Sequence, residues 1–149
     1  MRFILTRALL VLVCLGLFSL SPALAGAKSG PQEPMGNLVV ILHTDDPASA
    51  DAAIRIATVA AARGHKVTML LRVKGIQLAL KDTNYKLNGV ALQDKLSAFM
   101  KAGYRVFVGG GCMNLSNISP KRLIPGVRVG VPDSVMGMIF EKNTRIISQ

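Results

Sequence analysis

Cysteine and histidine are scarce in this sequence, which holds two of each among its 149 residues. So few thiols and imidazoles leave little material for a multi-cysteine zinc site or a disulfide framework. Charged residues are also sparse, at 17%, while 50% of the residues are apolar. This composition excludes a mainly disordered chain. The length excludes a large multidomain enzyme and suits a single domain.

Two ligand-binding patterns are missing as well. The glycines at positions 109–111 are not part of a G-x-x-x-x-G-K-[ST] phosphate-binding loop, so nucleotide binding is not expected. The 18 basic and 8 acidic residues give a net charge of +10. The lysines are nevertheless spread along the chain, without an aromatic-rich basic face or a charged C-terminal tail, so we expect no nucleic-acid partner.

The first 25 residues have the pattern of an export signal. Arg2 and Arg7 form a short basic region, residues 8–20 carry no charge, and residues 23–25 read Ala-Leu-Ala. This pattern predicts a signal peptide that is cleaved before Gly26, and hence a periplasmic or secreted protein. The alternative is an uncleaved membrane anchor, but 13 uncharged residues fall short of the roughly 20 that span a bilayer. We therefore expect no stable membrane span after cleavage.

Cleavage would change the composition of the working protein. The 124 residues that remain carry a net charge of +8 and a single cysteine, Cys112. An intrachain disulfide is then impossible, although one thiol can still join two chains.

The remaining sequence alternates between apolar runs and amphipathic segments. After a flexible lead-in at 26–36, we expect one domain over 37–149. The expected strands are 37–43, 66–73, 104–108, 127–131 and 144–148. The expected helices are 46–63, 90–102 and 134–142, with a short helical turn at 76–80 and a polar, mobile loop at 81–89.

This alternation predicts an α/β fold with three layers, in which a five-stranded, mostly parallel sheet has helices on both faces. In the first helix, Ala52, Ile56 and Val59 form the stripe expected to face the core. Ligands of such sheets bind at the carboxyl ends of the strands. The candidate site residues should therefore follow the strands directly.

Polar residues follow the first two strands. His43 could act as a base or a cationic neighbour for Cys112, or it could simply be hydrogen-bonded at the strand end. Asp45 and Asp46 precede a proline and are better explained by helix capping than by a metal site, so no metal or cofactor is predicted. Arg72 and Lys74 could bind an anionic, thiosulfate-like or persulfide group, or could form a solvated rim.

The third strand runs into Gly109-Gly110-Gly111-Cys112-Met113-Asn114. The glycines are expected to let the backbone turn sharply and to leave its amides exposed. A helix that begins near Met113 or Asn114 would point its amides and dipole at the sulfur, which favours a thiolate. We therefore assign substrate contacts to Gly110, Gly111, Met113 and Asn114, and a nucleophile or persulfide carrier to Cys112. The competing interpretation is that Cys112 is a small buried hydrophobe.

From Asn37 to Ile147, the sequence resembles the DsrE-like sulfur-relay family (the DsrE/DsrF/TusD group). The resemblance lies in HTDDP after the first strand, in ARGHKV before the second strand, and in VFVGGGCM and LIPGVRVG. It implies that Cys112 carries sulfur as a persulfide, and that the protein forms a dimer, trimer or hexamer of identical chains. Many relatives have C-G-x-C-M in this loop, and here Gly109 replaces the first cysteine, which excludes a two-thiol disulfide mechanism.

The leading hypothesis is therefore an exported, sulfurtransferase-like sulfur carrier in which Cys112 is the acceptor and His43 assists. Its partners would be a sulfur donor or acceptor protein, or a small sulfur compound. Two alternatives stay open. One is a non-enzymatic binding or assembly module on the same fold, and the other is a redox-responsive thiol protein.

Overall fold

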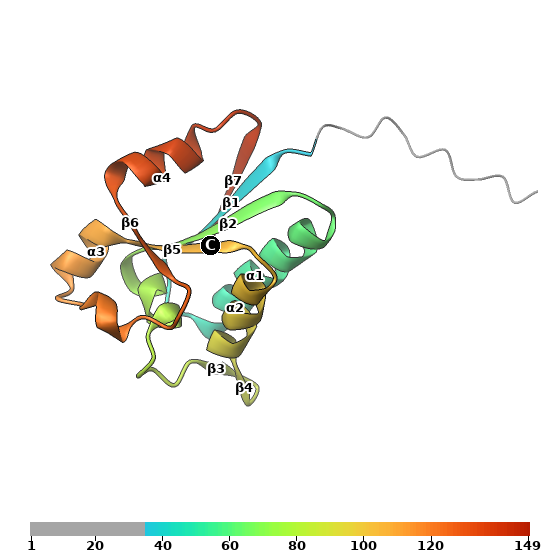
Figure 1. Cartoon of the computed structure of the whole chain (residues 1–149). Coiled ribbons are helices and arrows are strands. Elements are labelled where there is room, and N and C mark those ends of the chain that lie inside the picture. Colours follow the sequence, from blue (N-terminus) through green and yellow to red (C-terminus); the bar gives the residue numbers. More distant parts are fainter. Residues whose placement is uncertain (1–34) are drawn as a thin grey trace, which may run out of the picture. The chain divides into compact units, whose positions relative to one another are not determined.

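The computed structural model describes residues 35–149 (Figure 1). The predicted signal peptide and most of the predicted lead-in lie outside the described residues. The described chain forms these elements in order: β1 (Asn37–Leu42), α1 (Pro47–Ala62), β2 (Lys66–Leu71), the 3-10 segment η1 (Val73–Ala79), β3 (Lys86–Leu87), β4 (Val90–Ala91), α2 (Leu92–Lys101), β5 (Arg105–Gly109), α3 (Gly110–Leu115), η2 (Pro120–Arg122), β6 (Arg128–Gly130), α4 (Pro132–Ile139) and β7 (Thr144–Ser148).

Five of the strands form one sheet with the order β6-β5-β2-β1-β7, and each neighbouring pair is parallel. The expected α/β fold with a five-stranded sheet is thereby confirmed. Parallel neighbours need long crossover connections, and helices supply them. The chain reaches β7 from β6 through α4, which carries it from one edge of the sheet to the other.

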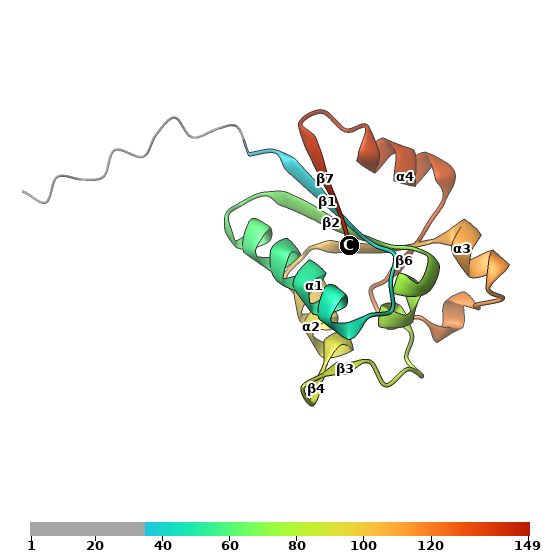
Figure 2. The ribbon, with the colours of Figure 1, turned by 180° about the vertical axis from the view of Figure 1, so that it is seen from behind.

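Helices cover both faces of the sheet (Figures 1 and 2). Val40 and Leu42 of β1 point into the larger core cluster, with residues of α1 and α2. The alternate residues Val39 and Ile41 point into a smaller cluster that Met138 of α4 completes. This alternation explains why β1 is an unbroken apolar run, because a strand covered on both faces has no polar side.

The start of α1 follows the sequence prediction. Asp46 is the N-cap residue, its Oδ2 accepts a hydrogen bond from the Ser49 N–H at 2.7 Å, and Pro47 opens the helix. Hydrogen bonds from Ser49, first from its side chain and then from its backbone, hold the pKa of Asp46 below its usual value. Capping therefore accounts for this carboxylate.

The face that α1 turns to the core differs from the expected one. The buried residues of the helix are Ala50, Asp51, Ala53, Ile54, Ala57 and Ala61. Val59, which we expected in the core, is 50% exposed, and Ala52 and Ile56 are only partly buried. The helix is apolar on two faces: the alanine-rich face is buried, and Ile56 and Ala60 of the other face pack against the core only in part.

The segment expected as a mobile polar loop contains a small hairpin. β3 pairs antiparallel with β4, and Asn88 and Gly89 connect them with φ values of 49° and 80°. An Asn-Gly pair with positive φ at both positions is the signature of a two-residue hairpin turn. The helix expected from residue 90 therefore begins at Leu92, because Val90 and Ala91 belong to the hairpin.

Tyr85, just before this hairpin, is 8% exposed, and its Oη is buried without a hydrogen-bond partner among the described residues. Burial, and then the charges of Asp45 and Asp46, raise the pKa of this phenol to about 12. A buried hydroxyl that lacks a partner costs about 1–3 kcal/mol.

We therefore predict that Tyr85→Phe raises the free energy of unfolding by about 1 kcal/mol, measured by urea denaturation. Because the folded protein favours the neutral phenol, wild-type protein should lose stability relative to the variant as the pH rises from about 10 to 12. Tyr104→Phe is the matched control, since Tyr104 Oη donates to the Ala61 carbonyl at 3.1 Å and its loss should destabilise. A less stable Tyr85→Phe would contradict the prediction.

Candidate functional site

The strand register brings the candidate residues to one edge of the sheet. Leu42 pairs with Leu71, and Leu71 pairs with Val108. The residues that follow these pairs, His43, Arg72 and Gly109, therefore lie in that order along the carboxyl edge. The three residues thus share one edge of the sheet.

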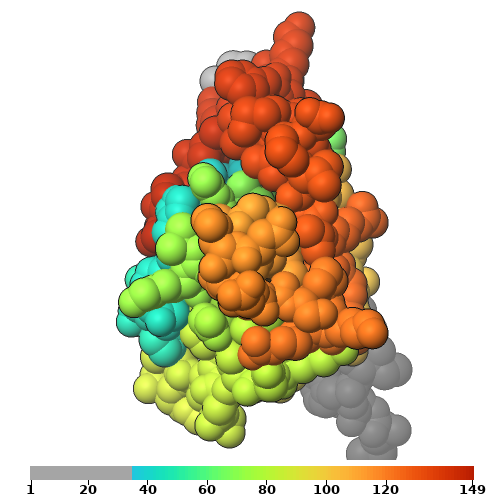
Figure 3. All heavy atoms as spheres, turned by 90° about the vertical axis from the view of Figure 1, so that its left-hand side faces the viewer, coloured from blue at the N-terminus to red at the C-terminus, as the bar shows by residue number. Residues whose placement is uncertain are grey.

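Cys112 lies in the first turn of α3, which begins directly after β5. Gly109 is the N-cap residue, so Cys112 is the third helical residue, and the helix starts earlier than Met113. Its thiol is free and partly buried. Figure 3 shows α3 (orange) at the centre of this face, between η1 (green) and the red-orange segment that holds β6 and α4.

This helix start changes which amides lie near the sulfur. The first N–H groups of a helix have no partner in the preceding turn, and no side chain caps α3. The N–H groups of Gly111 and Cys112 therefore have no partner within the helix, whereas Gly110 lies against the Gly130 carbonyl of β6. The amides of Met113 and Asn114 belong to the helical hydrogen-bonding pattern.

None of the three glycines has a positive φ, and they differ in how closely they approach their neighbours. A Cβ on Gly110 would stand 2.9 Å from the Gly130 carbonyl oxygen of β6, where a real Cβ does not fit. A Cβ on Gly109 would lie 3.4 Å from Cys112 Sγ, whereas one on Gly111 would meet nothing within 4 Å. The chain passes from β5 into α3 without a positive φ, and the small size of glycine is required at Gly110 but not at Gly111.

Arg72 is the candidate cation nearest to the thiol. Its Cγ and Cys112 Sγ both lie within 4 Å of the point where a Gly109 Cβ would stand. Lys74 is exposed and forms a long ion pair with Asp45, with 4.0 Å between Nζ and Oδ1. Val73 between them has a φ of 50°, which is strained for a β-branched residue. Strain of this kind accumulates at functional sites.

His43 does not contact Cys112 through any hydrogen bond of the described residues. Its backbone N–H donates to the Gln149 carbonyl, and its own carbonyl accepts from Lys74 and Gly75. Strand β2 lies between β1 and β5, so the two backbones are about 10 Å apart. The structure thus brings Arg72, and not His43, beside the sulfur.

The two remaining candidates differ in exposure. The Met113 side chain is 2% exposed and belongs to the larger core, so only its backbone can face a ligand. Asn114 is exposed to solvent. Gly130 is a residue that sequence reasoning missed, and the signal for it was a glycine that ends a short strand.

No group of three or more histidine, cysteine or acidic side chains is arranged to hold a metal ion within residues 35–149. Asp45 and Asp46 are engaged by Lys74 and by the α1 N-terminus. What the site offers chemically is one thiol in the first turn of a helix, with the Cγ of the Arg72 side chain nearby.

These features define an α/β protein with a single thiol at the carboxyl edge of a parallel sheet. Residues 37–147 match the DsrE/DsrF-like family, and the chain belongs to this family. The comparison with curated protein sequences gives no match.

Solved structures share the fold. The ychN protein from E. coli superposes with a TM-score of 0.68 at 16% identity, covering 77% of this chain and 100% of its own. MTH1491 from Methanobacterium thermoautotrophicum, described as a protein of unknown function, gives a TM-score of 0.64 at 16% identity, covering 76% of this chain and 99% of its own. At this identity the likeness concerns the fold.

We predict that Gly110→Ala lowers the free energy of unfolding by about 1–3 kcal/mol, because the new Cβ collides with the β6 backbone. Gly111→Ala is the matched control, since its Cβ meets open space and alanine favours a helix over glycine. Urea denaturation of both variants measures the difference. Equal midpoints for the two variants would contradict the close approach at Gly110.

A cysteine introduced at position 109 should form a disulfide with Cys112. The two Cβ atoms would be 3.8 Å apart, which is the usual separation in disulfides. We expect Gly109→Cys to resist alkylation under oxidising conditions and to react at two thiols after reduction, as measured by intact mass. Asn114→Cys is the control, because residues two apart on a helix do not face each other. Two free thiols in oxidised Gly109→Cys would exclude this geometry.

Proposed function

We propose that this DsrE/DsrF-like protein handles sulfur, and that Cys112 accepts one sulfur atom and carries it as a persulfide. The observation that supports the proposal is the free, partly exposed Cys112 thiol in the first turn of α3, beside Arg72. A free and partly accessible thiol at the carboxyl edge of a parallel sheet can act as the acceptor in a group transfer.

The transfer step balances without a further reactant. The Cys112 thiolate attacks the outer sulfur of a donor persulfide, R–S–SH. A new S–S bond forms at Cys112 as the donor S–S bond breaks, and the donor leaves as the thiolate R–S⁻. The proton stays on the transferred sulfur, and the net charge is −1 on both sides.

Each candidate residue has a part in this step. The backbone of Gly110 and Gly111 lies beside the sulfur, and the N–H groups at the helix start that have no helical partner stabilise the persulfide anion. Arg72 attracts the anionic donor group, and Lys74 adds positive charge farther along the edge. His43 follows β1, on the far side of β2 from Cys112. It can therefore contact the donor as the donor approaches, but it does not contact the sulfur atom.

We also propose that the protein works outside the cytoplasm, after cleavage before Gly26. The proposal rests on the pattern of the first 25 residues. Within residues 35–149, no helix has the length and apolar character to cross a membrane.

One experiment tests both proposals. Protein isolated from the exporting cell is incubated with a small-molecule persulfide donor, and its intact mass is measured. We expect the mass of a chain that begins at Gly26, increased by the mass of one sulfur atom. Treatment with dithiothreitol should remove that sulfur atom. Cys112→Ser should gain none, and Arg72→Gln should gain it roughly tenfold more slowly if the guanidinium contributes about 1.4 kcal/mol.

The same preparation supplies the opposing outcome. If Cys112 gains no sulfur while it still reacts with an alkylating agent, the sulfur carrier is excluded. The non-enzymatic binding or assembly module then becomes the better description. In that case Cys112→Ala should leave the size of the oligomer unchanged.

A further inference from the structure

Helix α1 has a second apolar face that the described residues cover only in part, because Ile56 and Ala60 pack against the larger core while Val59 stays exposed. Ala52, Ile56, Val59 and Ala60 lie outside the buried stripe, and Val59 is 50% exposed. A surface helix normally has one apolar stripe, with polar residues opposite. The second face of α1 therefore has the composition of a surface that something covers.

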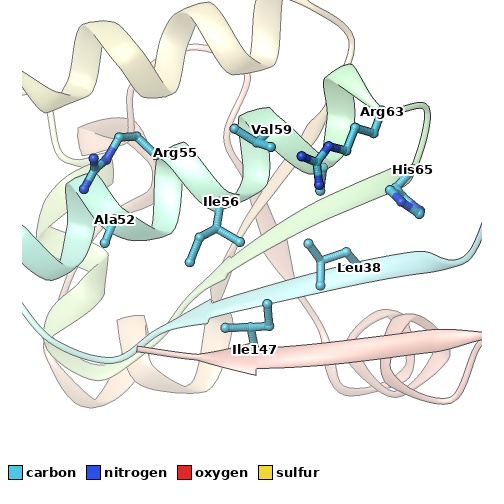
Figure 4. Close-up of a pocket in the computed structure, with 9 residues that line it drawn as sticks. Leu38, Ala52, Arg55, Ile56, Val59, Arg63, His65 and Ile147 are labelled. Atoms are coloured by element: carbon cyan, nitrogen blue, oxygen red, sulfur yellow. The ribbon is translucent and has the colours of Figure 1, made fainter. Parts of the chain in front are cut away.

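This face forms one wall of an open groove of about 610 Å³. We call it the β7 groove and define it by Leu38, Ile56, Val59, Arg63, His65 and Ile147. In Figure 4, Ile56 points from α1 toward the sheet, and Leu38 of β1 and Ile147 of β7 point up toward the helix. The floor of the groove is thus apolar and open to solvent.

The groove continues into the free edge of the sheet. Among the described strands, β7 pairs with β1 alone. The Gln149 N–H donates to the Ile41 carbonyl of β1, and the Gln149 carbonyl accepts from the His43 N–H. Backbone groups of alternate strand residues face opposite sides, so those of Ile147 also face β1. The N–H and carbonyl groups of Ile146 and Ser148 therefore point away from the sheet. Unpaired groups of this kind can hydrogen-bond an added strand.

The groove carries positive charge at its two ends. Figure 4 shows Arg55 at one end of the apolar floor, and Arg63 with His65 at the other. Arg55 shares Asp51 with Lys95, which leaves this trio with a net positive charge. Among the described residues Arg63 takes part in no ion pair, and no acidic side chain lines the groove.

A second copy of the chain fits this charge poorly. Five of the seven carboxylates in residues 35–149 are already held in ion pairs or a helix cap: Asp45, Asp46, Asp51, Asp82 and Glu141. A two-fold contact through the groove would also place the same arginines of both copies close together.

The segment 26–34 of the chain itself is also a poor occupant of the groove. It contains alanine and proline but no large apolar side chain to fill the floor.

We propose that the β7 groove binds an extended segment of another protein that is apolar in its centre and acidic at both ends. Its backbone pairs with the outward-facing groups of Ile146 and Ser148. Its apolar side chains fill the space between Ile147 and α1, and its carboxylates meet Arg55 and Arg63. This site is separate from the thiol, and the proposal does not depend on sulfur transfer.

The spacing of the charges defines the segment. Arg55 and Arg63 are eight residues apart on α1, or about 12 Å along the helix axis. An extended peptide advances about 3.3 Å per residue. Two acidic residues separated by three apolar ones therefore match the two arginines. The peptide Glu-Val-Ile-Val-Glu, blocked at both termini, is the corresponding probe.

The test is a titration of the purified full chain with this labelled peptide, followed by fluorescence polarisation. We expect saturable binding that weakens as salt is raised, and binding at least roughly tenfold weaker for Lys-Val-Ile-Val-Lys. Val59→Asp and Arg63→Glu should each weaken binding of the acidic peptide roughly tenfold. Cys112→Ser should bind it like wild type, which separates this proposal from that of sulfur transfer.

Matched controls are Val90→Asp and Lys101→Glu, which change similarly exposed residues outside the groove. Equal binding of the two peptides, or loss of binding in the controls as well, would overturn the proposal. Sedimentation measures the mass of the assembly for wild type and for Val59→Asp. An unchanged mass excludes a second copy of the chain as the occupant of the β7 groove. A smaller assembly would assign the groove to a copy of this chain instead.

Discussion

The position of the thiol depends on the approach of two backbones at Gly110 and Gly130. The β5–β6 pairing ends where Gly109 meets Gly130, and α3 begins at the next residue. Only a residue without a side chain fits at Gly110, where a Cβ would lie 2.9 Å from the β6 carbonyl. Because no linker separates β5 from α3, the position of Cys112 is fixed relative to the sheet, beside Gly109 and Arg72.

The same sheet is covered unevenly, and this creates the second surface. The core beneath α1 and α2 is large, whereas the face beneath α4 buries a small cluster around Val39, Leu70 and Phe107. The edge strand β7 lies beyond the buried stripe of α1, and Ile147, which shares the sheet face of Val40, is only partly buried. Parallel strands are usually buried on both faces. The edge position therefore leaves Ile147 of β7 in contact with both α1 and solvent.

The order of strands and helices was predictable because buried strands are recognisable as apolar runs such as 37–42, and the edge that holds Cys112 followed from topology alone. Two features were not predictable in this way. Which face of α1 packs against the core depends on the distance between the helix and the sheet. The apolar stripe of Ala52, Ile56 and Val59 in the sequence does not reveal that distance. The start of α3 depends on its contact with β6, which is distant in sequence. The hairpin at Asn88 and Gly89, in contrast, was predictable from the Asn-Gly pair itself, which favours a two-residue hairpin turn.

Glycine at position 109 has a chemical consequence for a sulfur carrier. A thiol there would stand within disulfide distance of Cys112, could attack the inner sulfur of a Cys112 persulfide, and would release hydrogen sulfide as a disulfide formed. With glycine in this place, residues 35–149 hold no second thiol for that reaction. A persulfide on Cys112 therefore lasts until an external thiolate attacks its outer sulfur. Such a carrier depends on a partner for both loading and release, and this need favours a separate surface that brings a partner close without blocking the thiol.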